Sequence, residues 1–121
     1  MSKRDPHGPL LDMRDYGQKA VRIASGLTLA ELRANEVVQL ALERVLEVIG
    51  EAANRVPQET QDQFDLIPWR AIVGLRNILA HAYDNVRDEV LLNIVHNELP
   101  NLIAQLDIAL GTFSDSVNDA E

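Results

Sequence analysis

The chain contains no cysteine among its 121 residues. A disulfide framework, a thiolate metal site and a cysteine nucleophile are therefore excluded, and the absence fits a reducing compartment such as the cytoplasm. The N-terminal region has no long apolar run, so we expect neither a signal peptide nor a membrane span. Aromatic residues make up only 4% of the chain, so leucine, isoleucine, valine and alanine carry most of its hydrophobicity, which suits helix packing.

Positive charge is also scarce. The chain has 11 Lys and Arg against 19 Asp and Glu, which gives a formal net charge of −8. Residues 31–65 and 84–121 carry −5 and −7 of this charge, whereas residues 66–83 carry +2. The overall acidity argues against broad, non-specific binding to nucleic acid, but it allows a small basic site in an acidic body.

The length of the chain predicts one domain. No segment alternates between polar and apolar residues with a period of two, so we expect an all-α fold. The natural arrangement is an up-and-down bundle of four main helices plus a short one. We place this helical domain at residues 9–113, with flexible tails at residues 1–8 and 114–121.

Helix signals divide the domain into segments. Apolar residues at helical spacing begin near Pro9 and stop at Gly26, after which Thr28 can cap a short turn. The longest predicted helix covers residues 36–55. A later helical pattern begins near Val90 and ends near Phe113. Pro100 must kink this segment or start a new helix, because proline cannot donate a backbone hydrogen bond.

Residues 68–83 lie in the longest window without an acidic residue. Wound as one helix, the window is apolar around most of its circumference, which predicts a central, buried helix with Trp69 in the core. A narrow polar ribbon remains, formed by Arg70, Gly74, Asn77 and His81. Arg76 lies inside the apolar arc, and a buried arginine is costly unless it is paired.

Three glutamates of the 36–55 helix, Glu43, Glu47 and Glu51, are spaced four residues apart on one face. Like charges at this spacing repel each other by a few tenths of a kcal/mol per pair, so a basic partner nearby is plausible. A solvated acidic face is the favoured interpretation.

Arg76, His81 and Tyr83 together read R-x4-H-x-Y. Ile67-Pro68-Trp69 precedes this motif, Leu99-Pro100 follows it, and the segment IGEAANR stands upstream at residues 49–55. With these elements the chain, over roughly residues 10–110, resembles the HEPN superfamily. Within that superfamily it is similar to the HepT-like toxins that are paired with a minimal nucleotidyltransferase called MntA.

The resemblance implies a helical bundle that forms a homodimer about a two-fold axis, with the motif helices facing each other. It also implies a metal-independent endoribonuclease in which Arg76 and His81 act on RNA at the dimer cleft, without a cofactor. The partner nucleotidyltransferase is implied to be an antitoxin that transfers AMP from ATP to Tyr83.

The residue types suit that chemistry. Histidine changes its charge near neutral pH, so His81 can take or give a proton, and the forked guanidinium of Arg76 can bind a phosphate. We assign Asn77 and Arg70 to binding RNA or orienting the site. A dimer would supply two histidines to one cleft. His7 and His96 form no metal-ligand spacing with His81, so we predict no metal site.

Simpler alternatives stay open for each residue. Arg76 could form a structural ion pair with Glu47 or Glu51, His81 could be a helix C-terminal residue favoured by the macrodipole, and Tyr83 could be a boundary tyrosine with a buried ring. At the level of function, the alternatives are a non-catalytic HEPN module that binds a nucleotide or a nucleotidyltransferase partner, and a helical dimer with an adaptor role.

Overall fold

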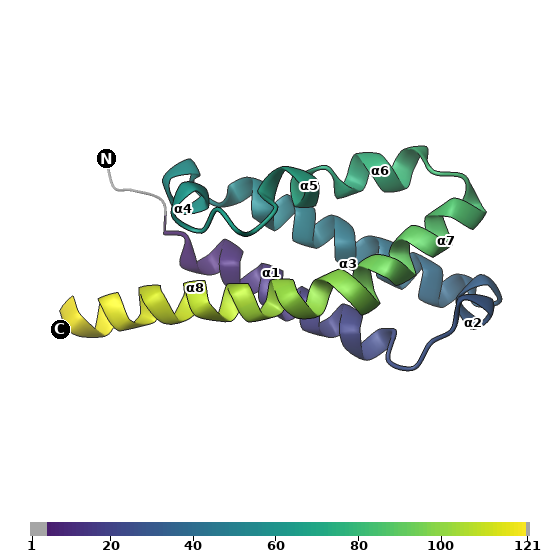
Figure 1. Ribbon diagram of the computed structural model, residues 1–121, viewed down its shortest axis with the longest axis horizontal. Coiled ribbons are helices and arrows are strands. Elements are labelled where there is room, and N and C mark those ends of the chain that lie inside the picture. The colour runs from purple at the N-terminus through teal and green to yellow at the C-terminus, as the bar shows by residue number, and fades with distance from the viewer. Residues whose placement is uncertain (1–4, 121) are drawn as a thin grey trace.

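The computed structural model describes residues 5–120, except for the side chains of residues 84–85 and 114–120. Over this range the chain is helical and contains no strand, which confirms the predicted all-α bundle (Figure 1). The helices are α1 (His7–Ile23), α2 (Leu29–Arg33), α3 (Glu36–Arg55), α4 (Gln58–Gln63), α5 (Trp69–Val73), α6 (Leu75–His81), α7 (Asp84–Asn93), the π-helix η1 (Ile94–Glu98) and α8 (Leu99–Ala120).

Helix α3 is the element against which most of the others pack. It contacts α1 as well as α2, α5, α6 and α7, while α8 lies along α1 (Figure 1). Large aliphatic side chains from α1, α3 and α8 fill the core between them. Fully buried examples are Leu10, Met13, Leu42, Leu46, Ile49 and Leu106. Leu42, Leu46 and Ile49 thus form the inward face of α3.

The first connection follows the sequence signals closely. Gly26, just beyond α1, has a φ of 71°, a left-handed conformation that glycine adopts without steric cost. Thr28 then caps α2: its hydroxyl accepts a hydrogen bond from the Glu31 backbone N–H, and the Glu31 carboxylate accepts one from the Thr28 backbone N–H. This reciprocal pair satisfies two backbone donors at the helix start, and the predicted cap is confirmed.

The C-terminal third forms one helical run from α7 through η1 to α8. In η1 the Leu99 N–H bonds to the carbonyl of Ile94, five residues earlier. Pro100 follows directly and occupies the first turn of α8, where its missing N–H is tolerated. Proline thus starts a new α-helix after a widened turn, one of the two predicted outcomes.

Helix α8 is also longer than α3, with 22 residues against 20, so our expectation that residues 36–55 form the longest helix is wrong. The helix continues past Gly111 to Ala120, beyond the predicted end near Phe113. Helix α1 begins at His7, two residues before the predicted start. The expected N-terminal tail at residues 1–8 lies partly outside the described residues.

The window 68–83 differs most from its prediction. It forms two short helices, α5 and α6, separated by Gly74, and the helix ends at His81. Trp69, Ile72, Leu75 and Leu79 are buried, but the rest of the window is largely exposed. The segment packs mainly against α3, so its remaining apolar residues stay on the surface of the single chain.

Candidate functional site

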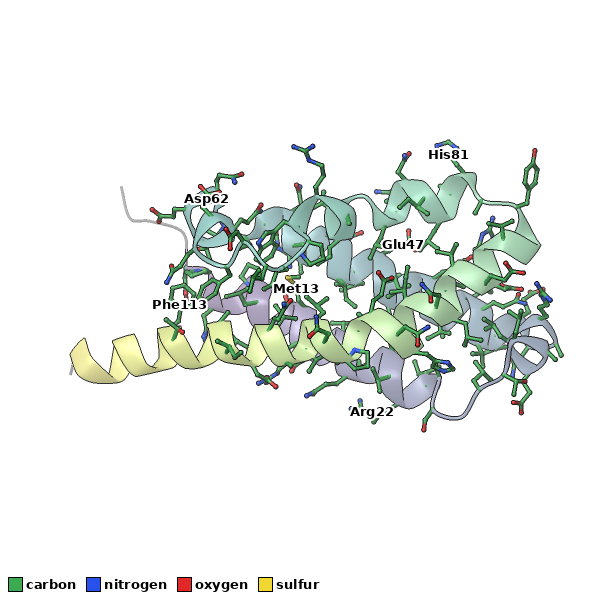
Figure 2. The ribbon with its side chains drawn as sticks, in the orientation of Figure 1. Met13, Arg22, Glu47, Asp62, His81 and Phe113 are labelled. Atoms are coloured by element: carbon green, nitrogen blue, oxygen red, sulfur yellow. The ribbon has the colours of Figure 1, made fainter. Side chains whose placement is uncertain are left out.

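Helix α6 presents the motif on the outer surface of the bundle. Arg76, Asn77 and His81 are all exposed, and His81 points away from the protein body in Figure 2. Two apolar side chains of the same segment, Val73 and Ile78, are also exposed, by 37% and 47%. The structure thus brings the predicted arginine, asparagine and histidine together on one short helix, beside apolar surface.

Arg76 is not buried, which corrects the sequence-based expectation. Its side chain is 73% exposed, and its Nε lies 4.0 Å from Oε2 of Glu47. Arg76 falls at the edge of the face that Leu75 and Leu79 turn toward α3, so its long side chain reaches solvent. The contact partly agrees with the alternative of a structural ion pair with Glu47. An exposed pair at this distance contributes less than about 1 kcal/mol to the free energy of unfolding.

The three glutamates on one face of α3, Glu43, Glu47 and Glu51, form ion pairs. Each of the three has an arginine within ion-pair distance. The pairs are Glu43 with Arg87 at 3.1 Å, Glu47 with Arg76 at 4.0 Å, and Glu51 with Arg44 at 3.5 Å. Basic side chains of the same chain therefore lie beside this face, the alternative that the spacing made plausible, while Glu47 and Glu51 remain 31% and 43% exposed to solvent.

Tyr83 lies on the corner after α6, at the N-cap position of α7. Ala82 ends α6 with an extended ψ of 141°, so the helical repeat does not place Tyr83 on the face of Arg76. The tyrosine is 86% exposed, which excludes the alternative of a boundary tyrosine with a buried ring. Its side chain is accessible to a large partner.

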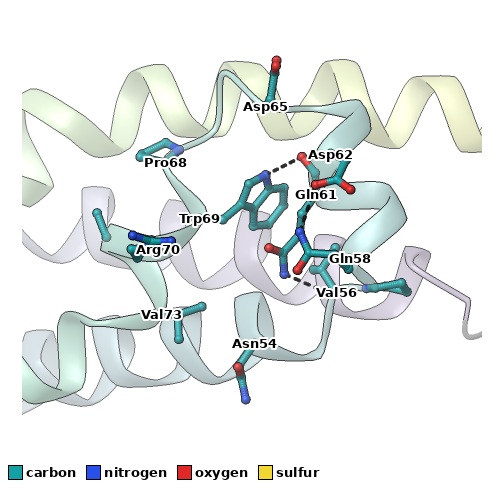
Figure 3. A pocket seen from close by; sticks show the side chains of 12 residues that line it. Asn54, Val56, Gln58, Gln61, Asp62, Asp65, Pro68, Trp69, Arg70 and Val73 are labelled. Atoms are coloured by element: carbon teal, nitrogen blue, oxygen red, sulfur yellow. Dashed lines mark hydrogen bonds between the residues drawn. The ribbon is translucent and has the colours of Figure 1, made fainter.

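Arg70 lies apart from this group. It lines a surface hollow between α4 and α5, together with Asn54, Gln58 and Asp62 (Figure 3). Trp69 forms part of the same wall, and its indole Nε1–H donates to the backbone carbonyls of Gln61 and Phe64. None of Arg76, Asn77 and His81 lines the hollow, so within one chain the structure does not join Arg70 to the motif.

Sequence reasoning missed Arg87. Its guanidinium donates a hydrogen bond to the carbonyl of Ala82, between His81 and Tyr83, while it pairs with Glu43. The residue lies outside the recognised motif, and its partner is on a distant helix. Only its place in an otherwise acidic segment marked it as unusual.

Among the residues that the structure describes, no group of three or more His, Cys, Asp or Glu side chains could hold a metal ion. No helix in this part of the chain is long and apolar enough to cross a membrane. The exposed motif is therefore the best candidate for a functional site. Its chemistry is a cation for a phosphate and an imidazole for proton transfer.

Comparison with known families bears directly on this site. The profile of the family described as ribonuclease HepT-like matches residues 13–108, which include every motif residue from Arg76 to Tyr83. The chain belongs to the HepT-like ribonuclease family. This confirms the resemblance inferred from the motif.

Similar proteins occur in Methanocaldococcus jannaschii and Thermococcus cleftensis. A protein of Methanocaldococcus jannaschii named "Putative RNase" is 32% identical over 89% of this chain and 99% of its own length. A second from the same organism, with the same type of name, is 30% identical over 88% of both chains. A Thermococcus cleftensis protein named "Probable ribonuclease HepT" is 39% identical over 53% of this chain and 58% of its own. No solved structure matches this HepT-like chain significantly.

Proposed function

We propose that this HepT-like protein is a metal-independent endoribonuclease whose active site forms at the cleft of a homodimer, and that it is the toxin of a toxin–antitoxin pair. The observation that carries the proposal is the surface of α6, where Arg76, Asn77 and His81 are exposed together in a member of a ribonuclease family. In this proposal Arg70, in the separate hollow beside α5, contacts RNA outside the catalytic cleft.

The apolar part of this surface supports dimer formation. Val73 and Ile78 would bury their exposed side chains against a second copy, which gives the association a hydrophobic driving force. A two-fold axis beside α6 would then place two Arg76 and two His81 side chains around one cleft. An isologous contact of this kind is the commonest form of homodimer.

Two histidines make the chemistry complete. His81 of one protomer takes the proton of the RNA 2′-hydroxyl, and the 2′-oxygen attacks the adjacent phosphorus. The bond from phosphorus to the 5′-oxygen breaks, and the other protomer's histidine protonates the departing oxygen. The products are a 2′,3′-cyclic phosphate and a free 5′-hydroxyl. Arg76 stabilises the negative charge that builds on the phosphoryl oxygens, and Asn77 orients the ring or the RNA.

Tyr83 is the proposed point of control. Its hydroxyl oxygen attacks the α-phosphorus of ATP held by a cognate nucleotidyltransferase, and pyrophosphate leaves. The high exposure of Tyr83 supports its access to a second enzyme. The attached AMP adds a phosphodiester anion next to the cleft, where it competes with the RNA phosphate for Arg76.

A second function has an observation in its favour. The net charge of −8 opposes RNA binding, because a phosphate backbone is repelled by an acidic protein. A non-catalytic module that binds a nucleotide or a nucleotidyltransferase partner would not have to bind the phosphate backbone of an RNA. The exposure of both Arg76 and His81 in a member of a ribonuclease family favours the nuclease.

The cleavage test compares His81→Ala with His7→Ala, which removes a histidine outside the motif. We expect His81→Ala to abolish RNA cleavage and growth inhibition while remaining a folded dimer, because the ring is exposed and fills no part of the core. We expect His7→Ala and addition of EDTA to leave cleavage unchanged. Cleavage by His81→Ala at the parent rate, or its loss with EDTA, would contradict the mechanism.

The control test uses the two tyrosines of the chain. The protein, Tyr83→Phe and Tyr16→Phe are each incubated with the cognate nucleotidyltransferase, ATP and magnesium, and the intact proteins are weighed. We expect AMP on the parent and on Tyr16→Phe but not on Tyr83→Phe. Equal modification of all three proteins would exclude Tyr83 as the sole acceptor. A parent that takes no AMP would favour the binding-module function.

A further inference from the structure

The Arg87 side chain links the corner between α6 and α7 to the bundle. Arg87 donates from Nη2 to the carbonyl of Ala82 over 3.1 Å. Its backbone N–H donates to the carbonyl of Tyr83 over 2.7 Å. Two successive carbonyls of the corner therefore accept hydrogen bonds from one residue, and the first of them lies between His81 and Tyr83.

Glu43 holds the other end of this arginine. Its Oε1 lies 3.1 Å from Nη1 of Arg87, and the two side chains are only 19% and 29% exposed. They are better shielded from solvent than Arg76 and Glu47, so the interaction is less weakened by water and salt. Glu43 belongs to α3, whose inward face is buried in the core, which makes it a firm anchor.

The local backbone explains why the corner needs the hydrogen bond from Arg87. Ala82 leaves the helical conformation with a ψ of 141°, so its carbonyl no longer points along α6 and needs a donor from elsewhere. The planar guanidinium can donate in two directions at once, toward Glu43 and toward Ala82, which a single ammonium group does less well.

We propose that Arg87, anchored by Glu43, is a positioning residue that sets the direction in which the corner presents His81 and Tyr83. The inference rests on the proposed function, because it assigns Arg87 a part in both RNA cleavage and AMP transfer. Arg87 acts through the backbone of Ala82 and touches neither substrate. Removing it leaves the reacting groups present but misaligned.

The test uses Arg87→Met, with Arg33→Met as the matched control. Arg33 also forms an arginine–glutamate pair that involves α7, with Glu89 at 3.0 Å, but it does not bond to the corner. For each dimeric protein we would measure kcat and KM for RNA cleavage, the rate of AMP transfer to Tyr83, the unfolding temperature, and amide hydrogen exchange in the peptide that spans residues 81–88.

In Arg87→Met we expect exchange in this peptide to be about tenfold faster, because a charge-assisted hydrogen bond is lost. We expect kcat and the rate of AMP transfer to fall roughly tenfold to a hundredfold, the effect of displacing reacting groups by a fraction of an ångström, with KM nearly unchanged. The unfolding temperature should fall no further than in Arg33→Met, which should keep parental kinetics and exchange.

A double-mutant cycle tests the anchor. Glu43→Gln should slow both reactions, and Glu43→Gln combined with Arg87→Met should be no slower than Arg87→Met alone, because both act through one contact. Additive losses would overturn the role of Glu43 as the anchor of Arg87.

Two further results would overturn the positioning role. One is unchanged exchange at the corner in Arg87→Met, and the other is an equal kinetic loss in Arg33→Met. A parent that neither cuts RNA nor accepts AMP would refute the proposed function, and the positioning role would fall with it. An active parent with an equally active Arg87→Met variant would refute the positioning role alone.

Discussion

Gly50 lies where α3 and α5 come into close contact, and Gly50→Ala tests how tightly the site is packed onto the core. The glycine is buried in α3. A Cβ placed on it would lie 2.9 Å from the backbone carbonyl oxygen of Ile72 in α5. A backbone atom cannot rotate away as a side-chain end can, so α5 as a whole must shift outward to admit the methyl group.

The size of the effect follows from two opposing contributions. Alanine is better than glycine inside a helix by about 1 kcal/mol. Overpacking of a close contact costs typically about 1–3 kcal/mol. We therefore expect Gly50→Ala to lower the free energy of unfolding by roughly 0–2 kcal/mol. Cleavage should also fall, because α5 leads directly into α6 and the motif.

Gly111→Ala is the matched control. This glycine also lies inside a long helix, but a Cβ added to it has no atom within 4 Å in its surroundings. The helix-propensity gain then acts alone, so we expect stabilisation by up to about 1 kcal/mol. The difference between the two variants, roughly 1–3 kcal/mol, isolates the contact with Ile72.

The assay is urea unfolding at one fixed protein concentration, because a dimer's apparent stability depends on concentration. Fluorescence of Trp69, the single tryptophan, reports on α5 itself, and circular dichroism reports on the whole bundle. Equal stabilisation by Gly50→Ala and Gly111→Ala would refute the argument, since it would mean that α5 does not press on α3 at this position.

Three further predictions concern the surface and the caps. Ile78→Glu should convert the proposed dimer to monomers in light scattering and abolish cleavage, whereas a dimer that persists would exclude this face as the interface. Arg76→Ala should remove cleavage but change the free energy of unfolding by less than about 1 kcal/mol, because the side chain is exposed; strong destabilisation would contradict this. Thr28→Ala should cost about 1 kcal/mol as a lost N-cap. The backbone N–H and the hydroxyl of Thr28 lower the pKa of Glu31. The stabilisation from the charged carboxylate is therefore fully present above the ordinary glutamate pKa and is lost as the pH falls through the lowered pKa. Glu31→Gln should flatten this fall of the free energy of unfolding at acid pH in unfolding curves.

Local signals predicted the parts of the fold that depend on local chemistry. The bounds of α3 agree with the predicted 36–55, because Asn35 caps its start and Pro57 prevents its continuation. Thr28 and Gly26 likewise act through bonds and dihedral angles within a few residues. Such features need no knowledge of what packs against them.

The burial of the window 68–83 could not be predicted in this way. Periodicity shows which residues share a face, but it does not show how many faces another element covers. Among the described elements α3 makes most of the contacts with this segment, so Arg76 and Ile78 are exposed where a fully covered helix would bury them. In the proposed dimer, a second copy of the chain covers the apolar residues that stay exposed on this segment.

The candidate site likewise has one part that local sequence predicts and another that depends on contacts between remote segments. The motif fixed the identities of Arg76, Asn77, His81 and Tyr83, and the fold places the first three on one helix. Arg87 bonds to the carbonyl of Ala82 at the turn that carries Tyr83, and its ion-pair partner Glu43 lies on a helix remote in the sequence. Pairings between helices that are remote in the sequence leave no periodic trace, so this part of the site appears only in three dimensions.

The π-helix before Pro100 also changes which residues in the last third of the chain lie on the same helix face. A π-turn holds one residue more than the α-turn that it replaces, so the side chains after η1 are out of rotational phase with those before it by about 100°. Leu91 and Leu106 are both buried, yet they do not belong to one uninterrupted apolar stripe. Deleting one residue from Ile94–Glu98 would restore a regular helix and turn α8 about its axis, which would carry Leu106 away from α1. A one-residue length difference between relatives at this point is therefore a change of helix phase, and an alignment across it should be split at η1.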